Sequence, residues 1–314
     1  MDRKIHIAIT HNDNYTKHAV VCMTSICENM KEEEIVFHIL DGGLRDDSKQ
    51  NILTISDTYK NTQIQFDKVD NTIFENYKKS DYYPVQMLWT TILPEIPEIK
   101  DLDRIIYLDC DLIVTNSLRP LWDMDFEDNY ILAVEDANGK KYSKRYLKNG
   151  AKFFNTGLMV INCKKWQENN ITSKAIKMAL ENTGTALGYD QTVLNILFTG
   201  KVKYLDLKYN LQYCPLNVWA SYDDFDEYRK AIKEPSVIHY VGDYKPWVQG
   251  LGCYNPKQDD YLKYHKLTIY KIEDYKKWLI IDKLKFYKGL FAFIKRYPFF
   301  FLKKKFWQSK FFKI

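Results

Sequence analysis

The segment RIIYLDCDLIV, residues 104–114, contains an apolar run that ends in two aspartates separated by one cysteine. A short apolar run bounded by charged residues predicts a buried strand. In open α/β sheets ligands bind beyond the carboxyl ends of the strands, where Asp109 and Asp111 would lie. Two carboxylates there could grip Mg²⁺ or Mn²⁺ together, and such an ion neutralises a diphosphate. Because D-x-D is short and common, the pair taken alone is also compatible with solvated turn aspartates.

Apolar runs alternate with helical patterns along most of the chain, which predicts an α/β domain with a largely parallel sheet. The helical patterns separate predicted strands, as crossover connections require. Predicted helices cover residues 19–30, 46–59, 173–181 and 190–198. Predicted strands cover residues 5–10, 34–40, 63–69, 104–108, 130–134, 158–162, 202–205 and 236–240.

Residues 283–314 form a separate compositional unit. They contain 10 Lys or Arg, 12 aromatic residues and no Asp or Glu, whereas residues 1–282 contain 36 basic and 41 acidic residues. Interleaved aromatic and cationic side chains fit an anionic membrane surface better than nucleic acid, because apolar faces insert while ammonium groups meet headgroups. A helical pair packed on the body is the remaining interpretation. No apolar run approaches the roughly 20 residues that span a bilayer, so we expect peripheral attachment.

The N-terminus and the cysteines indicate a cytoplasmic protein, peripheral on the inner face of the membrane. Residues 1–10 lack the long apolar region and small-residue cleavage site of a signal peptide. The six cysteines are dispersed and form no C-x-x-C pair, so we expect reduced thiols and neither a disulfide framework nor a zinc site. We expect three parts: a catalytic domain over 1–250, a helical connection over 251–282 and a basic aromatic tail over 283–314.

A second segment, SVIHYVGDYKPW at residues 236–247, carries chemistry complementary to the aspartates. His239 lies at a predicted strand end, and an imidazole can complete a Mn²⁺ shell beside two carboxylates. Gly242 allows backbone to approach a phosphate, and the Lys245 ammonium is a compact phosphate partner. Singly, a strand histidine is more often structural and a lysine is usually solvated. Their joint occurrence favours a nucleotide-diphosphate site.

Seven ordered blocks in about the first 250 residues resemble glycosyltransferase family 8, in particular its bacterial lipooligosaccharide α-galactosyl- and α-glucosyltransferases. The resemblance implies a GT-A fold, Rossmann-like and nucleotide-binding, with the tail as a helical extension. It also implies a UDP-galactose or UDP-glucose donor, a cell-surface glycan or glycolipid acceptor, Mn²⁺ dependence and retention of anomeric configuration. The blocks are NDNY (12–15), FHILDGGL (37–44), YLDCDLIV (107–114), SLRPLWDMD (117–125), FNTGLMVINCKKW (154–166), YDQTVLN (189–195) and HYVGDYKPW (239–247).

The same resemblance implies roles for individual residues at the nucleotide end. Asp109, Asp111 and His239 would bind the metal, and Gly242 and Lys245 would contact the diphosphate. The nucleoside would be held by Thr10, Asn12, Asn14 and Tyr15, with the tyrosine ring offering a face for uracil.

The N-terminal block also has a simpler interpretation as a polar turn after the first strand. Family members often carry Asp where Asn12 stands, so the base contact here would be a neutral acceptor. The sequence alone does not decide between the two interpretations of this block.

The hexose would be surrounded by Asp136, Asn155, Asp190 and Gln191, which match family positions. Such carboxylates and amides can bind hydroxyl groups and stabilise an oxocarbenium-like transition state. Retention through a covalent intermediate and retention by attack from the leaving-group side both stay open. Asp190 or Gln191 could instead cap the helix that follows, and Asp190 is the better candidate for such a cap.

One departure from the family lies in QMLWTTILPE, residues 86–95. Where the family commonly has an Arg that reaches the donor, this chain has Thr90. The donor would then be held differently, for instance through Gln86 or Trp89, or the hexose would differ. Trp89 is also a natural core residue, given its apolar neighbours.

Two other classes compete with a transferase. In haloacid dehalogenase-type phosphatases a strand also ends in D-x-D, but these enzymes need an acid four residues after a later Gly-Asp, and Trp247 stands at that place after Gly242. A nonenzymatic glycan-binding module is suggested by 24 Tyr and 7 Trp, although such a module needs no metal ligands. We expect no nucleic-acid partner.

Overall fold

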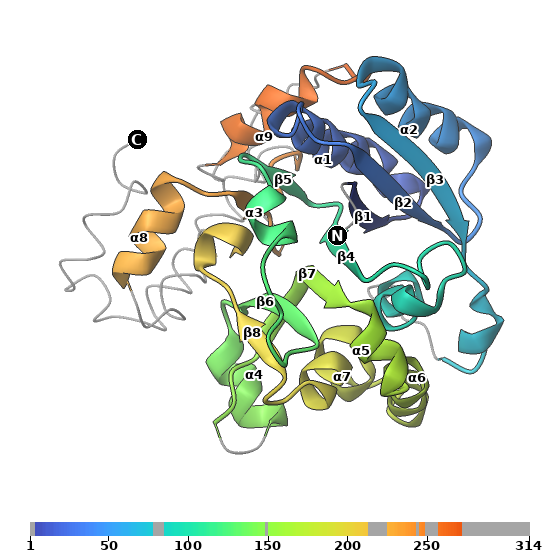
Figure 1. Cartoon of the computed structure of the whole chain (residues 1–314), viewed down its shortest axis with the longest axis vertical. Helices are drawn as coiled ribbons and strands as arrows, with labels where there is room; N and C mark the ends of the chain where they lie inside the picture. The colour runs from blue at the N-terminus through green and yellow to red at the C-terminus, as the bar shows by residue number, and fades with distance from the viewer. Residues whose placement is uncertain are drawn as a thin grey trace, which may run out of the picture.

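The computed structural model describes residues 4–77, 85–147, 150–212, 225–242, 245–248 and 257–271. Its main element is a seven-stranded sheet in the order β3-β2-β1-β4-β7-β6-β8 (Figure 1). β1 to β4 are parallel, β7 is antiparallel to both β4 and β6, and β8 is parallel to β6. The predicted α/β class with a largely parallel sheet is therefore confirmed. The strands are β1 (Ile5–Thr10), β2 (Ile35–Asp41), β3 (Thr62–Lys68), β4 (Arg104–Asp109), β6 (Ile131–Glu135), β7 (Phe154–Asn162) and β8 (Val202–Tyr204).

Both faces of this sheet are buried, because successive side chains on a strand point to opposite sides. On β1, Ile7 and Ile9 belong to one apolar core and Ala8 to the other. The first core is covered by α1 (Thr16–Asn29) and α2 (Asp46–Thr58), which connect β1 to β2 and β2 to β3. The second is covered by α5 (Cys163–Glu168), α6 (Ile171–Glu181) and α7 (Asp190–Leu197). The result is the three-layer arrangement that near-continuous apolar strands require.

A smaller sheet brings His239 to the carboxyl edge of the main sheet. It has the order β5-β10-β9, with β5 (Leu112–Val114), β9 (Leu211–Gln212) and β10 (Val237–His239). β10 is antiparallel to β5, and in this register His239 lies opposite Leu112. Because β5 follows β4 after only two residues, the end of β10 is brought beside the two aspartates.

The remaining elements are short helices around these sheets. α9 (Gln258–His265) lies within the predicted connection 251–282 and packs on α1, where Asn29 Nδ2 donates to Tyr264 Oη at 2.8 Å. Among the described residues, no helix combines the length and apolar character needed to cross a membrane. The predicted tail, 283–314, lies outside the described residues. The short elements are α3 (Arg119–Trp122), α4 (Gly139–Tyr146), α8 (Phe225–Lys233), α9 (Gln258–His265) and 3-10 turns at Asp13–Tyr15, Asn71–Phe74, Val85–Thr91, Leu93–Glu95, Ala186–Gly188 and Leu207–Asn210.

The four described cysteines are free thiols, as expected from the sequence. Cys22, Cys27 and Cys163 are buried and Cys110 is partly buried. Burial raises the pKa of Cys163 to about 12, so this thiol stays protonated and unreactive. The other two cysteines of the chain, Cys214 and Cys253, lie outside the described residues.

Candidate active site

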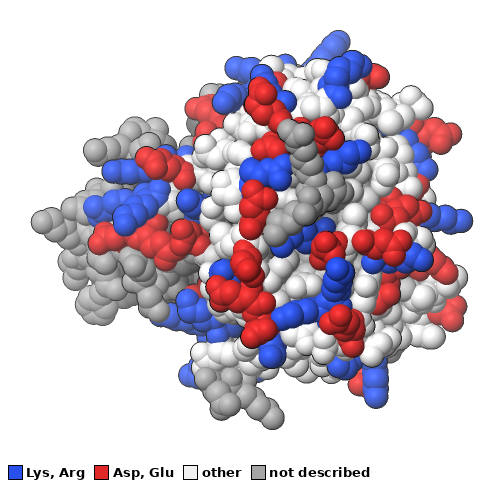
Figure 2. Space-filling view, viewed as in Figure 1, with Lys and Arg blue, Asp and Glu red and all other residues white. Residues whose placement is uncertain are grey.

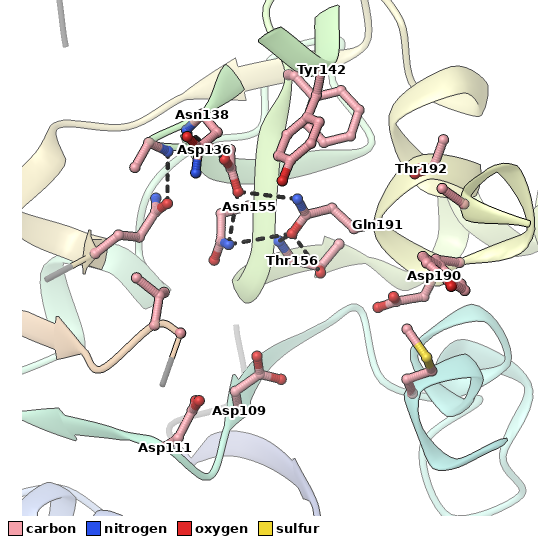
Figure 3. Close-up of a pocket in the computed structure, with 18 of the residues that line it drawn as sticks. Asp109, Asp111, Asp136, Asn138, Tyr142, Asn155, Thr156, Asp190, Gln191 and Thr192 are labelled. Carbon is pink, nitrogen blue, oxygen red and sulfur yellow. Dashed lines mark hydrogen bonds between the residues drawn. The ribbon is translucent and has the colours of Figure 1, made fainter. Parts of the chain in front are cut away.

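A cavity of about 860 Å³ opens at the carboxyl edge of the main sheet (Figure 3). Thr10 and Asp109 end β1 and β4, and Asp136 directly follows β6. Because β7 runs antiparallel to its neighbours, its first residues, including Asn155, lie at this same edge. Of the residues expected at the site, those that line the cavity are Thr10, Asn12, Tyr15, Asp109, Asp111, Asp136, Asn155, Asp190, Gln191 and Gly242.

Three of the expected residues lie elsewhere. His239 and Lys245 do not line the open space but contact Asp111. Asn14 is exposed and does not line the cavity, and its backbone N–H donates to Asn12 Oδ1 at 3.1 Å. The Asn12 side chain thus caps the turn that follows, as the simpler interpretation of this block proposed.

Asp109, Asp111 and His239 converge around one small volume, with a ligand atom of each within 4.8 Å of the others. His239 Nε2 lies 3.0 Å from Asp111 Oδ1 and 3.8 Å from Asp109 Oδ2. Asp111 Oδ1 is buried and has no hydrogen-bond donor among the described residues. Two carboxylates and one imidazole form a donor set that suits a divalent cation, and an orphaned buried oxygen is consistent with a metal ligand. We refer to these three residues as the metal triad.

The metal triad carries an excess of negative charge that the protein only partly offsets. Burial and the neighbouring Asp111 raise the pKa of Asp109 above its ordinary value. Burial also opposes ionisation of Asp111, but Lys245 and His239 outweigh it and hold the pKa of that carboxyl well below its ordinary value. Lys245 Nζ donates to Asp111 Oδ2 and to the Tyr240 carbonyl. The lysine therefore supplies part of the positive charge that this group of acids requires.

The backbone N–H of Gly157 determines the orientation of His239 through a chain of two side-chain amides. Gly157 N–H donates to Asn155 Oδ1 at 3.0 Å, so that oxygen is fixed. Asn210 Nδ2 donates to the same oxygen at 2.9 Å, which turns Asn210 Oδ1 toward His239 Nδ1 at 3.1 Å. His239 Nδ1 then donates to Asn210 Oδ1, and Nε2 faces the aspartates, where it can donate to a carboxylate when protonated or bind a metal through its lone pair. This is how metal-binding histidines are generally oriented by an outer partner.

Three of the four residues expected around the hexose, Asp136, Asn155 and Gln191, form one hydrogen-bonded cluster across the cavity from Asp109 and Asp111, as the dashed lines in Figure 3 show. Asp136 Oδ2 accepts from Gln191 Nε2 at 3.0 Å and from Asn155 Nδ2 at 3.2 Å. Gln191 Oε1 accepts from the Thr156 N–H at 3.2 Å. Burial raises the pKa of Asp136, although these donors and the Asn138 N–H oppose the shift. Polar groups held this firmly can bind hydroxyl groups without reorganising.

Asp190 is buried at the first position of α7 and has no ion-pair partner among the described residues. Tyr189 is the N-cap of this helix, so Asp190 is not the cap that the sequence suggested. Burial raises its pKa to about 7, with a smaller contribution from the charge of Asp109. Thr90, at the position where the family commonly has Arg, places its Oγ1 3.5 Å from Asp190 Oδ2. Among the described residues, a hydroxyl and no cation therefore lies beside this carboxyl group.

The nearby residues Gln86 and Trp89 differ in their access to the site. Gln86 lines the cavity, which keeps it available to a donor. Trp89 is 1% exposed and its Nε1 donates to Asn71 Oδ1 at 2.9 Å. Trp89 is therefore a core residue, and the suggestion that it contacts the donor is wrong.

Sequence reasoning assigned no role to three residues that shape the site. His11 lines the cavity with both ring nitrogens buried and without a hydrogen-bond partner among the described residues, and burial lowers its pKa to about 4. Asn210 orients His239, but nothing in its local sequence marks it. Gly157 lies under the metal triad, where a Cβ would come 2.2 Å from His239 Cε1 and 2.9 Å from Asp109 Oδ2. Its place inside the block FNTGLMV was the available signal.

Known proteins are similar to the part of the chain that carries the candidate site. The model of the family named Glycosyl transferase family 8 matches residues 6–250. General stress protein A of Bacillus subtilis (strain 168) is 27% identical over 274 residues, which cover 85% of this chain and 95% of that protein. The lipopolysaccharide 1,2-glucosyltransferase of Escherichia coli is 28% identical over 246 residues, 75% of this chain and 71% of that protein.

Solved structures show a similar fold. The crystal structure of galactosyltransferase LgtC in complex with donor and acceptor sugar analogs gives a TM-score of 0.71 at 25% identity. The alignment covers 87% of this chain and 99% of that chain. The likeness therefore extends over most of this chain and almost the whole of that protein.

Replacing Gly157 by Ala tests the geometry of the metal triad. The added methyl group must displace His239 or Asp109, so we expect the affinity for UDP in the presence of Mn²⁺ to fall at least roughly tenfold. Isothermal titration calorimetry with and without Mn²⁺ measures the effect. Met159→Leu, a volume-conserving change in the same strand, serves as the control and should keep wild-type affinity. Wild-type affinity in Gly157→Ala would show that this geometry does not matter.

Replacing Asp190 by Asn tests the buried carboxyl group. A carboxyl with a pKa of about 7 when folded and 3.8 when unfolded binds a proton on folding between these pH values. The free energy of unfolding therefore falls as pH rises from about 4 to 7, and Asp190→Asn removes this loss. We expect the metal-free variant to melt roughly 5 °C above wild type at pH 8, with the gain shrinking toward pH 5.

Thermal melts in chelator across this pH range measure the gain. The exposed Asp101→Asn change is the control and should show no pH-dependent gain. A melting difference for Asp190→Asn that is the same at every pH would contradict the buried, proton-binding state of this carboxyl group.

Proposed function

The chain belongs to glycosyl transferase family 8 and is a glycosyltransferase of the GT-A fold, and on this premise we propose that it transfers galactose or glucose from a UDP-sugar to a cell-surface glycan. The metal triad is the observation that carries this proposal. The names of two similar proteins, a lipopolysaccharide glucosyltransferase and a galactosyltransferase, support the hexose and the class of acceptor. We further propose that transfer retains the anomeric configuration and depends on Mn²⁺.

The donor's diphosphate would bind at the metal triad. Asp109, Asp111 and His239 would hold the cation, and a nitrogen ligand beside oxygens favours Mn²⁺ over Mg²⁺. When bound, the ion would neutralise the diphosphate as it becomes the leaving group. Lys245 already pairs with Asp111 at this point, so its ammonium is placed to meet phosphate oxygens. Gly242, with φ of 72°, adopts a backbone conformation that favours glycine and leaves no side chain in the way.

The nucleoside would bind at the end of β1, where buried polar atoms have no hydrogen-bond partner among the described residues. Thr10 Oγ1 is buried without a hydrogen-bond partner among the described residues, as are both nitrogens of His11. Tyr15 is 37% exposed and packs edge-on against Trp247, with ring centroids 6.4 Å apart. One face of the tyrosine can therefore receive a base. Asn12 would contribute its side-chain amide group.

The hexose would lie between the metal triad and the cluster of Asp136, Asn155 and Gln191. Of the four cavity aspartates, two belong to the metal triad and Asp136 is engaged by three donors. Asp190 is the remaining carboxyl group, so we propose that it supplies the negative charge that an oxocarbenium-like transition state requires. Gln191 Oε1 already accepts from Thr156 and Asn155, which suits it to orient neighbours and not to attack carbon.

Neither competing class is favoured by these findings. A phosphatase is disfavoured by family membership, by the incomplete acidic set after Gly242 and by the convergence of His239 on both aspartates. A binding module without activity is disfavoured because the curated relatives named above include a transferase and the donor set is intact.

We propose the cytoplasmic face of a membrane as the place of action, on the composition of residues 283–314. These residues carry 10 basic and 12 aromatic side chains and no acidic one. On the described part of the face shown in Figure 2, basic and acidic side chains lie interspersed, unlike the uniform basic surface that nucleic acid requires. The tail is therefore basic throughout, whereas residues 1–282 mix both signs of charge.

Replacing Asp111 by Asn tests the transferase proposal. Loss of one carboxylate from the metal triad should abolish Mn²⁺-dependent UDP release from UDP-galactose and UDP-glucose, with a drop of at least roughly 100-fold. The exposed Asp101→Asn change should leave UDP release intact. Substantial UDP release by Asp111→Asn, or no UDP release by the wild-type protein with any UDP-sugar, would contradict the proposal.

Truncation after residue 282 tests the membrane proposal. Without the cationic aromatic tail, the protein should remain in the supernatant with anionic vesicles while the full chain sediments, and sedimentation of the full chain should weaken as salt rises. Neutral vesicles of the same size provide the control. Equal sedimentation of both forms with anionic vesicles would show that the tail is not the membrane-binding element.

A further inference from the structure

Resting on the proposed function, we propose that the acceptor glycan carries an anionic group, a phosphate or a carboxylate, which binds to the face of α4 that lines the cavity. This face consists of Lys141, Tyr142, Arg145 and Tyr146, and we call it the α4 wall. None of these residues belongs to the metal triad or to the cluster around the hexose. All four line the cavity.

The sequence of α4 explains why one of its faces is both basic and aromatic. The helix reads GKKYSKRY and has four basic residues and no acidic one. Residues four apart in a helix lie on the same face. Lys141 therefore lies above Arg145 and Tyr142 above Tyr146. Ser143, which follows Tyr142 and does not line the cavity, is buried and its hydroxyl donates to the Ala151 carbonyl, which fixes the helix on the body.

The two cations of the α4 wall lie beside tyrosine rings. The rings of Tyr142 and Tyr146 are nearly parallel, with centroids 6.3 Å apart, and Tyr142 also packs on Phe153 at 5.3 Å. The Arg145 guanidinium lies 5.2 Å from the centroid of Tyr146, and Lys141 Nζ lies 5.9 Å from that of Tyr142. Sugar rings stack on tyrosine faces and anions pair with guanidinium and ammonium groups. The α4 wall thus offers both kinds of contact to one ligand.

The two cations are not used elsewhere in the described part of the chain. Neither Lys141 nor Arg145 has an acidic partner there, whereas nearby Lys152 pairs with Glu135 at 3.1 Å. An unpaired cation at the edge of a cavity raises the local concentration of anionic ligands. The planar fork of Arg145 matches two oxygens of a phosphate or carboxylate, and Lys141 adds a point charge.

The position of the α4 wall assigns this anion to the acceptor and not to the donor. The donor's diphosphate has the metal triad and Lys245 at the other end of the cavity. In Figure 3, Tyr142 lies on the opposite side of Asp136, Asn155 and Gln191 from Asp109 and Asp111. A donor hexose that contacts this cluster would fill the space between the metal triad and the α4 wall. The next sugar along, the acceptor, meets the two tyrosines and the two cations.

Sugar binding to the protein saturated with UDP and Mn²⁺ tests the proposal. Saturation-transfer NMR compares galactose with galactose 6-phosphate and with galacturonic acid, so that the two charged arms distinguish phosphate from carboxylate. We expect at least one charged sugar to bind roughly five- to tenfold more tightly than galactose, with the advantage shrinking at high salt. In the Lys141→Gln/Arg145→Gln variant the charged sugar should bind no better than galactose. Lys144→Gln, on the same helix but outside the cavity lining, should behave as wild type.

Three results would overturn the proposal. One is equal binding of galactose and both charged sugars to the wild-type protein. Another is an equal loss of charged-sugar binding in Lys144→Gln, which would reveal only a general charge effect. The last is a loss of UDP-sugar hydrolysis in the double variant as large as its loss of charged-sugar binding, which would assign the cations to the donor. Failure of the proposed function itself would appear separately, as a wild-type protein that releases no UDP from any UDP-sugar.

Discussion

The metal triad brings two carboxylates and an imidazole together at the edge of a buried sheet. The two carboxylates give this place an excess of negative charge, and the rest of the site depends on how that charge is offset. The close approach is a consequence of chain connectivity. β5 follows β4 after two residues, and the antiparallel pairing of β10 with β5 leaves His239 no other place than beside Asp111. Like charges in a buried region are stable only with a counter-charge. Lys245 provides one, and a divalent cation would complete the balance.

The same constraint connects the metal triad with the sugar end of the cavity. Asn155 holds Asp136 with its amide nitrogen and Asn210 with its amide oxygen, and Asn210 in turn orients His239. The backbone N–H of Gly157 fixes the orientation of the whole chain of amides. The residues that would bind the hexose and those that would bind the metal are therefore linked through Asn155 and Gly157 of one strand, β7. Preorganisation of this kind is what electrostatic stabilisation of a transition state requires.

The sequence predicted the parts of this arrangement that are encoded locally. Alternating apolar residues predict β1 as it is observed, and D-x-D after an apolar run predicts where Asp109 and Asp111 lie. β5 has only three residues and was not predicted, and although a strand over 236–240 was, nothing in the sequence shows that the two strands pair. That His239 joins the two aspartates was inferred from the complementary chemistry of the two segments and from the family resemblance. Asn210 and Gly157 act through tertiary contacts, and α4 has few apolar residues to mark it as a helix. The apolar neighbours of Trp89 favoured a core position over a donor contact, and the structure buries its side chain.

The most direct test of the shared cation is pulsed electron paramagnetic resonance of the protein with Mn²⁺ and UDP, prepared with ¹⁵N-labelled histidine. If the account is correct, one directly bonded histidine nitrogen couples to the manganese, and the coupling disappears in His239→Gln although five other histidines remain in the chain. Manganese that binds together with UDP but shows only oxygen ligands, or a nitrogen coupling that survives in His239→Gln, would contradict it.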